Sequence, residues 1–115
     1  MRPASDVAPA RLRGPDVRET LRRGRRYAGT RVILYERPGL DHHGAGFVAG
    51  RRVGGAVKRN RARRLLREAW RSLAPEIDRG ADVVFVARRE ILEGTFADLV
   101  NEVRTLLARA QLVSA

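Results

Sequence analysis

The clearest chemical signal in the sequence is the basic run "KRNRARRLLREAW" at positions 58–70. Between Arg51 and Arg71 nine residues are basic, and Glu68 is the single acidic one. Guanidinium groups make bidentate contacts with phosphates and stack on bases, and clustered cations displace counterions from nucleic acids. Exposed helix faces usually mix the two signs of charge, so a segment of one sign favours a polyanion-binding surface over an inert solvated one.

The charge of the whole chain agrees with this interpretation. Twenty-four basic residues against 13 acidic ones give a formal net charge of +11, and every basic residue except Lys58 is arginine. Nucleic acid is the first polyanion to consider, and an anionic membrane surface is the second. No apolar run approaches the roughly 20 residues that span a bilayer, and the N-terminus lacks the apolar region of a secretion signal. We therefore expect a cytoplasmic protein with no membrane partner.

Side chains that could cut RNA or hold a metal are few and scattered. The chain has no cysteine, which excludes disulfides and thiolate metal sites. Its acidic residues occur singly, and we expect Asp82 to end a turn rather than to bind a metal. We expect His42 and His43 to lie on a loop surface, because they follow each other in a glycine-rich segment. No catalytic residue, metal site or protein-bound cofactor is therefore predicted.

Two glycine-rich segments resemble phosphate-binding loops only superficially. "GAGFVAG" at 44–50 has the spacing G-x-G-x-x-x-G and the composition of a strand, so these glycines are predicted to permit close packing or the close approach of a ligand. "GRRVGGAVK" at 50–58 lacks the G-K-[ST] ending of a phosphate loop. Gly54 and Gly55 do precede a predicted helix N-terminus, where free N–H groups favour anions, close to Arg51, Arg52 and Lys58.

Periodicity and turn residues predict one α+β domain over residues 14–115, preceded by a flexible basic arm over residues 1–13. In the strand over 30–36, Val32 and Leu34 point to one face and Ile33 and Tyr35 to the other, which is open to a ligand if the long helix covers the first face. The predicted elements are a helix over 14–24, a strand over 30–36, a loop over 37–44, a strand over 45–49, a helix over 55–74, a strand over 81–87 and a helix capped by Thr95 and Asp98.

The helix over 55–74 is predicted to have one apolar wall and one basic wall. Helical spacing places six apolar residues on a single arc, namely Ala62, Leu65, Leu66, Ala69, Trp70 and Leu73. Asn60 and four arginines share the opposite arc, with Arg61 at its margin, while Lys58 and Arg59 belong to a solvent-open first turn near a groove. Trp70 and Phe96 are predicted to pack in the core rather than to stack on bases.

Several of these segments together resemble the bacterial ribonuclease P protein component. In "RRVGGAVKRNRARRLLREAW", Arg59, Asn60 and Arg61 match the central R-N-R motif of that family. "DVRETLRRGRR" before "VILY", and "DVVFVAR" before a closing amphipathic helix, support the match, which runs from about residue 11 to residue 110.

The resemblance implies a fold and a function. The implied fold is a two-layer α-β sandwich of order α-β-β-(β)-α-β-α with a left-handed βαβ crossover, although general chain rules predict a right-handed one. The implied function is that of the protein subunit of ribonuclease P, which binds a catalytic RNA, with one protein expected per RNA, and the 5′ leader of precursor tRNA. The RNA subunit, which requires Mg²⁺, removes the leader endonucleolytically, and the protein alone is expected to be inactive.

The resemblance also assigns residues to two surfaces. The RNA-binding residues it implies are Arg51, Arg52, Lys58, Arg59, Asn60, Arg61, Arg63, Arg64, Arg67 and Arg71. A leader groove between the first helix and the sheet would contain Val17, Leu21, Ile33, Tyr35 and Val48. The family often has phenylalanine where this chain has Val17 and Leu21, and serine where it has Val48 and Gly50, so stacking worth about 1–3 kcal/mol per base is missing at the first pair.

Two other functions remain open at this point. A structural RNA-binding protein, such as a ribosomal component, would share the size and charge but would need no leader groove. A stand-alone nuclease is disfavoured by the lack of clustered carboxylates, and cleavage without any RNA partner would revive it.

Overall fold

The fold is built around β5 (Gly80–Ala87), an apolar strand that pairs in parallel with β4 (His43–Ala49) and antiparallel with β3 (Val32–Leu40). The structure, a computed structural model, describes residues 10–114. Two shorter strands, β1 (Ala10–Arg11) and β2 (Arg25–Ala28), complete the sheet order β1-β4-β5-β3-β2. Within these residues the helices are α1 (Gly14–Arg23), α2 (Ala56–Leu73) and α3 (Phe96–Arg109), with 3-10 turns η2 (Arg51–Val53), η3 (Ala74–Glu76) and η4 (Arg89–Leu92).

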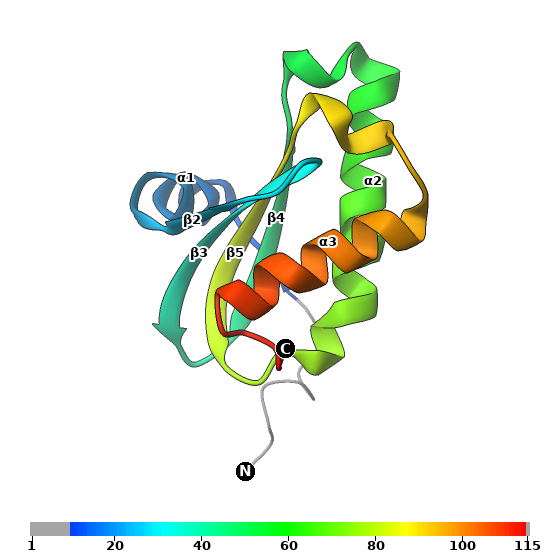
Figure 1. Ribbon diagram of the computed structural model, residues 1–115. Coiled ribbons are helices and arrows are strands. Elements are labelled where there is room, and N and C mark those ends of the chain that lie inside the picture. The colour runs from blue at the N-terminus through cyan, green and yellow to red at the C-terminus, as the bar shows by residue number, and fades with distance from the viewer. Residues whose placement is uncertain (1–9, 115) are drawn as a thin grey trace.

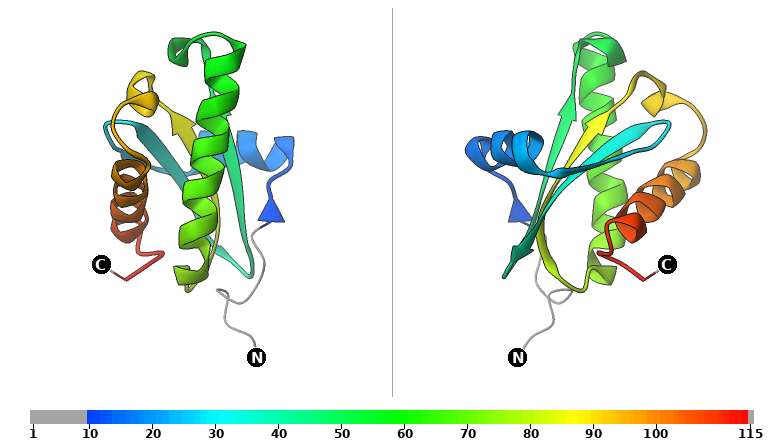
Figure 2. Two further views of the ribbon diagram at one scale, coloured as in Figure 1. Left: turned by 90° about the vertical axis from the view of Figure 1, so that its right-hand side faces the viewer. Right: turned by 60° about the vertical axis from the view of Figure 1, so that its left-hand side comes forward.

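The helices lie on both faces of the sheet (Figure 1). α2 and α3 pack on one face and form the predicted two-layer sandwich with it, whereas α1 lies across the opposite face, against β3 and β5. In the left view of Figure 2, α2 faces the viewer, β4 and β5 run upward, and β5 lies to the left of β4. The β4–α2–β5 crossover is therefore left-handed, as the resemblance implied and against the general preference.

The core lies between the sheet and the α2–α3 layer. Val32 and Leu34 of β3 are fully buried there, and Ile33 and Tyr35 are half-buried on the opposite face, as the alternation predicted. Five of the six apolar residues predicted for α2 are buried and Leu65 is half-buried at the border of the core. The ring of Trp70 lies 5.7 Å from that of Phe85 on β5, which ties α2 to the centre of the sheet.

No helix in the described part of the chain is long and apolar enough to cross a membrane.

α3 is held by its cap and by one carboxylate. The side chain of Thr95 accepts a hydrogen bond from the N–H of Asp98, and the carboxylate of Asp98 accepts one from the N–H of Thr95, which confirms the predicted capping box. The carboxylate of Glu102 accepts hydrogen bonds from the backbone N–H groups of Arg31 (2.7 Å) and Val32 (2.9 Å) and pairs with the Arg31 guanidinium at 3.2 Å. This contact locks α3 onto the start of β3.

The prediction of a loop over residues 37–44 is wrong. β3 continues to Leu40 and β4 begins at His43, so only Asp41 and His42 lie between the two strands. The apolar pattern ends before Arg37, so it predicted a strand that is too short. The last residues of β3 are polar or turn-forming, but they still pair with β5, with an irregularity between Pro38 and Leu40. Within the described residues three strands, β2, β3 and β4, therefore lie between α1 and α2.

Two polar residues near this turn were misplaced by the sequence analysis. His43 lies not on the surface but on β4, only 2% exposed, with its ring edge-on to Trp70 at 5.9 Å. Burial, with a smaller contribution from neighbouring His42, lowers the pKa of His43. Asp82 lies within β5 rather than at a turn, and it pairs with the Arg37 guanidinium at 2.8 Å. Arg37 also reaches Asp16 at 3.7 Å, which joins α1 to the sheet.

Two further expectations differ from the structure. Phe96 is 43% exposed instead of packing in the core, because it is the first residue of α3 and lies beside the cap. Ala10 and Arg11, predicted as part of the arm, pair with Gly44 and Ala45 of β4, so ordered structure begins before residue 14. Residues 1–9 of the predicted arm lie outside the described residues.

Glu102→Ala is expected to lower the free energy of unfolding by about 2–4 kcal/mol, because two backbone donors lose their shared acceptor in a partly buried position. Urea denaturation followed by far-UV circular dichroism measures this change. The control is Glu76→Ala, which breaks an exposed pair with Arg104 and should cost less than about 1 kcal/mol. Equal losses in the two variants would contradict an anchoring role for Glu102.

Glu36→Gln is expected to stabilise the protein at pH 7. Glu36 is 1% exposed, and burial raises the pKa of its carboxyl, with Arg25 and Arg79 opposing the shift. The folded wild-type protein therefore binds the Glu36 proton more tightly than the unfolded chain. The stability that protonated Glu36 contributes to the wild type is fully present below pH 4.5 and is lost as the pH rises through the folded pKa, and glutamine avoids this loss. Thermal melts from pH 4 to 7 should show a gain that shrinks toward low pH, with exposed Glu68→Gln as the control. A gain independent of pH would contradict this origin.

Candidate nucleic-acid interface

The basic residues of η2 and α2 lack carboxylate partners. None of the nine between Arg51 and Arg71 lies within ion-pair distance of a carboxylate among the described residues. Elsewhere seven arginines do have such a partner, namely Arg22, Arg23, Arg31, Arg37, Arg79, Arg89 and Arg104. The segment is therefore not a surface laced by salt bridges, and its repulsion is available for an anionic partner to relieve.

α2 presents these residues because its two walls differ as predicted. Lys58, Asn60, Arg61, Arg64 and Arg71 are exposed. The side chains of Arg59, Arg63 and Arg67 are half-buried at the flanks of the helix, and Arg63 donates a hydrogen bond to the side chain of Asn60. The helix begins after Gly55, whose residue type supplies no capping side chain, so its first N–H groups remain available. Gly54 has φ of 138°, a conformation that strongly favours glycine.

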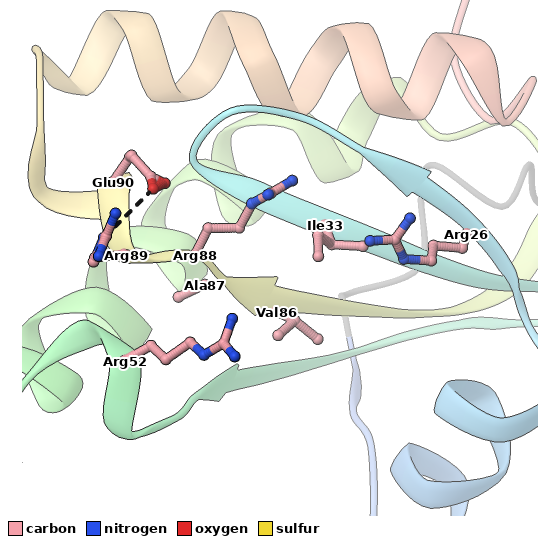
Figure 3. Close-up of a pocket in the computed structure, with 8 residues that line it drawn as sticks. All are labelled: Arg26, Ile33, Arg52, Val86, Ala87, Arg88, Arg89 and Glu90. Atoms are coloured by element: carbon pink, nitrogen blue, oxygen red, sulfur yellow. Dashed lines mark ion pairs between the residues drawn. The ribbon is translucent and has the colours of Figure 1, made fainter.

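A pocket of about 670 Å³ opens at the end of the sheet, on the face opposite α2; we call it the sheet-end pocket (Figure 3). Its apolar floor is Ile33 and Val86, which are paired in register between β3 and β5. Arg26 and Arg52 direct their guanidinium groups toward this floor, and the Arg88 guanidinium extends toward the turn between β2 and β3. Arg89 turns toward Glu90, 4.0 Å away. The pocket is lined by Arg26, Ile33, Arg52, Val86, Ala87, Arg88, Arg89 and Glu90.

The rim of the sheet-end pocket is held by backbone hydrogen bonds. The N–H of Arg88 donates to the carbonyl of Arg31 at 2.8 Å, and the Arg88 side chain donates to the carbonyl of Gly29 at 3.0 Å. Arg88 is thus fixed where β5 ends beside the turn between β2 and β3. Guanidinium groups around an apolar floor, one of them fixed, suit a ligand with phosphates and exposed bases.

A second, smaller groove of about 280 Å³ lies where α1 begins, beside α2 and β4; we call it the edge groove. Val17 packs closely over Gly46, where an added Cβ would approach Val17 to 2.9 Å. The guanidinium of Arg67 lies 5.6 Å from the centre of the Phe47 ring. The groove is lined by Leu12, Gly14, Val17, Arg18, Gly46, Phe47, Arg63 and Arg67.

The residues predicted for a leader groove share one region but not one pocket. Ile33 lines the sheet-end pocket, and Val48 is paired with Val86 at its floor. Tyr35, half-buried, lies on the same face one row closer to α1, paired with Val84. Val17 instead lines the edge groove, and Leu21 is half-buried on α1.

Six residues of the sheet-end pocket were missed by the sequence analysis: Arg26, Val86, Ala87, Arg88, Arg89 and Glu90. One available signal was the arginine pair that directly follows a buried strand. Because β5 alternates, Val86 had to share a face with Asp82 and Val84, but only the pairing with Ile33 identifies that face as the open one. Arg26 could not be placed, because the short β2 was not predicted as a separate strand.

Other titratable groups do not form a reactive cluster within residues 10–114. The described residues contain no group of three histidine, aspartate or glutamate side chains arranged to hold a metal ion. His42 lies 2.9 Å from Asp41 and 3.7 Å from Asp82, whereas His43 faces the core on β4. Both hollows are instead lined by arginines beside apolar side chains, which suits binding of an anion.

Comparison with known sequences gives consistent matches. The family model described as Ribonuclease P matches residues 9–111. The ribonuclease P protein component of Chloroflexus aurantiacus is 42% identical over 108 residues, covering 91% of this chain and 80% of that protein. The corresponding protein of Roseiflexus castenholzii is 42% identical over 106 residues, covering 90% of this chain and 87% of its own length.

Solved structures show the same fold. The RNase P protein from Thermotoga maritima superposes with a TM-score of 0.75 at 28% identity, covering 86% of this chain and 96% of that one. The RNase P protein from Staphylococcus aureus has a TM-score of 0.78, covering 94% of this chain and 100% of that one; at 22% identity it speaks for the fold alone.

Proposed function

The chain belongs to the ribonuclease P protein family, and from this premise we propose that it joins a catalytic RNA and the 5′ leader of precursor tRNA during removal of that leader. As a ribonuclease P protein component it is part of a ribonuclease holoenzyme. In this proposal Arg51 of η2 and the basic residues of α2 bind the catalytic RNA, and the sheet-end pocket, which Arg52 of η2 lines, binds the leader. The product is the mature 5′ end of the tRNA.

The observation that carries the proposal is the contrast between paired and unpaired arginines. Nine basic residues from Arg51 to Arg71 have no carboxylate partner in the described structure, while seven other arginines do. Six other arginines with described side chains also lack such a partner, namely Arg13, Arg18, Arg25, Arg26, Arg88 and Arg109, but nine of these fifteen unpaired cations lie on one helix and the turn before it. A phosphate backbone docked there releases counterions and relieves the repulsion.

The sheet-end pocket supports leader binding because single-stranded RNA offers both bases and phosphates. Ile33, Val86 and the adjacent Val48 supply an apolar floor, and Arg26, Arg52 and Arg88 supply cations around it. The floor lies on the sheet face opposite α2, so the two RNAs can be bound at the same time. Charge placed between two polyanions lowers the repulsion that opposes their association.

Catalysis is assigned in this proposal to the RNA subunit with its Mg²⁺, and this chain alone is expected to be inactive. We propose one protein per catalytic RNA in the cytoplasm. The protein then acts by tightening the binding of precursor tRNA and by lowering the Mg²⁺ concentration that the reaction requires, since its arginines take over part of the charge neutralisation.

Replacing Arg61, Arg64 and Arg71 together by glutamine is expected to weaken binding to the catalytic RNA. The slope of log affinity against log salt should become shallower by about 2–3, because each lost phosphate contact takes roughly 0.7–0.9 from that slope. Fluorescence anisotropy at several salt concentrations measures both quantities. The matched control replaces Arg22, Arg23 and Arg104, which lose the same charge but have carboxylate partners. An equal loss in the control would mean that binding follows net charge rather than α2.

The double variant Arg26→Gln/Arg88→Gln is expected to lower the affinity of the holoenzyme for a leader-bearing precursor roughly tenfold, through the loss of charge-assisted contacts. Its affinity for mature tRNA should not change. The measurement is leader release at low Mg²⁺ with catalytic RNA, with and without protein, over a series of leader lengths, and Arg22→Gln/Arg104→Gln is the control.

The same assay separates this function from that of a structural RNA-binding protein. A protein that binds RNA tightly but does not restore leader release at low Mg²⁺ would contradict the proposal and favour a ribosomal type of role. Cleavage by the protein without any RNA subunit would instead point to a nuclease.

A further inference from the structure

The edge groove is a second hollow that the proposed leader contact does not use. β1 pairs with β4 only at Gly44 and Ala45, and the N–H of Leu12 donates to the carbonyl of Ala45 at 3.0 Å. Beyond Ala45, within the described residues, this edge of β4 has no neighbouring strand. α1 begins on one side of the open edge and α2 passes on the other.

Three arginines from two different helices meet at this groove. Arg18 comes from α1, and Arg63 and Arg67 come from α2. None of the three has a carboxylate within ion-pair distance among residues 10–114, and the side-chain partner that Arg63 has is the neutral Asn60. Like charges converging on one hollow are unfavourable by themselves, so the arrangement suits an anion between them.

The floor of the groove is apolar and rigid. Leu12 and Val17 lie on the α1 side of the β4 edge, where Val17 is held in close contact with Gly46, and Phe47 lies on the α2 side of the same edge. The Phe47 ring stacks on Phe85 with centroids 6.0 Å apart and planes within 10° of parallel. A base that reaches this edge contacts apolar side chains on both sides of β4, and a base stacked beside an arginine gains a cation–π contact as well.

The size and chemistry of the groove together select one kind of occupant. Its volume of about 280 Å³ is below the roughly 300–1,000 Å³ of pockets that enclose whole small ligands. A duplex keeps its bases inside the stack, so it cannot offer a base to this floor. A single unpaired nucleotide offers a base for the floor and phosphates for the arginines.

We propose that the edge groove receives one unpaired nucleotide of the catalytic RNA, with its base against Leu12, Val17 and Phe47 and its phosphates at Arg18, Arg63 and Arg67. The inference rests on the proposed function, because two of these arginines belong to the α2 surface assigned to that RNA. It adds α1 to the RNA contact through Arg18. It also makes the contact specific for RNA shape, since only an unpaired position fits.

Footprinting of the catalytic RNA with a reagent that acylates flexible 2′-hydroxyl groups provides the first test. The wild-type protein should protect one or two unpaired nucleotides in addition to the α2 footprint. Arg18→Gln should remove this protection and lower affinity roughly tenfold while leaving the α2 footprint in place. Arg22→Gln, one turn further along α1 and paired with Glu19, should change neither.

Crosslinking provides a second test that keeps all three arginines. The chain contains no cysteine, so Gly14→Cys places a single thiol at the rim of the groove, where an added Cβ meets only Arg18 at 3.5 Å. A photoreactive azidophenacyl group on this thiol should crosslink to the protected unpaired nucleotide. The same group on Arg22→Cys should not reach it.

The outcomes separate this inference from the proposed function. Binding of the catalytic RNA without any protected unpaired nucleotide, or with protection that survives Arg18→Gln, would overturn the inference and leave the proposed function standing. If an oligo-aspartate peptide added before irradiation prevents the crosslink but single-stranded RNA does not, the inference would also be overturned, in favour of an acidic peptide. Failure to bind the catalytic RNA at all would overturn the proposed function first.

Discussion

The packing of α2 on β5 is the interaction on which the rest of the structure depends. Trp70 meets Phe85 at the centre of the sheet, and Ala62, Leu66 and Ala69 bury the same side of the helix. This apolar anchor, rather than salt bridges, holds a helix whose other side carries unpaired cations. Without it the repulsion among those guanidinium groups would favour an unfolded or displaced helix, because like charges on adjacent turns destabilise a helix.

The central position of β5 also separates the two surfaces. Its Val83 and Phe85 side chains face α2, while Val84 and Val86 face the side on which α1 lies. α1 covers the middle of that second side, joined to it by the pairing of Arg37 with Asp16 and Asp82. The end of the sheet is therefore not covered by α1. The arginines around this end line the sheet-end pocket and do not pack against another element.

The fold keeps several polar groups inside, and one of them, His43, was predicted to lie at the surface. Glu36 and His43 occupy core-facing positions of their strands, and among residues 10–114 no hydrogen-bond partner meets Glu36 Oε1 or either ring nitrogen of His43. Residue type alone places such groups at the surface, since their burial is costly. Only the registers of β3 and β4 with β5 show that they lie inside. Phe96 is the reverse case, an apolar residue left exposed because it begins α3.

Periodicity in the sequence predicts the three helices, the central strands and one basic wall on the long helix, since buried and exposed positions repeat every 3.6 or 2 residues. The sequence also indicates the family, through Arg59, Asn60 and Arg61 and the segments around them. The left-handed crossover was implied by that resemblance alone. Only the tertiary structure decided which cations share a pocket. Arg26, Arg52 and Arg88 come from three distant segments, and local periodicity holds no record of contacts that strand register and helix placement create.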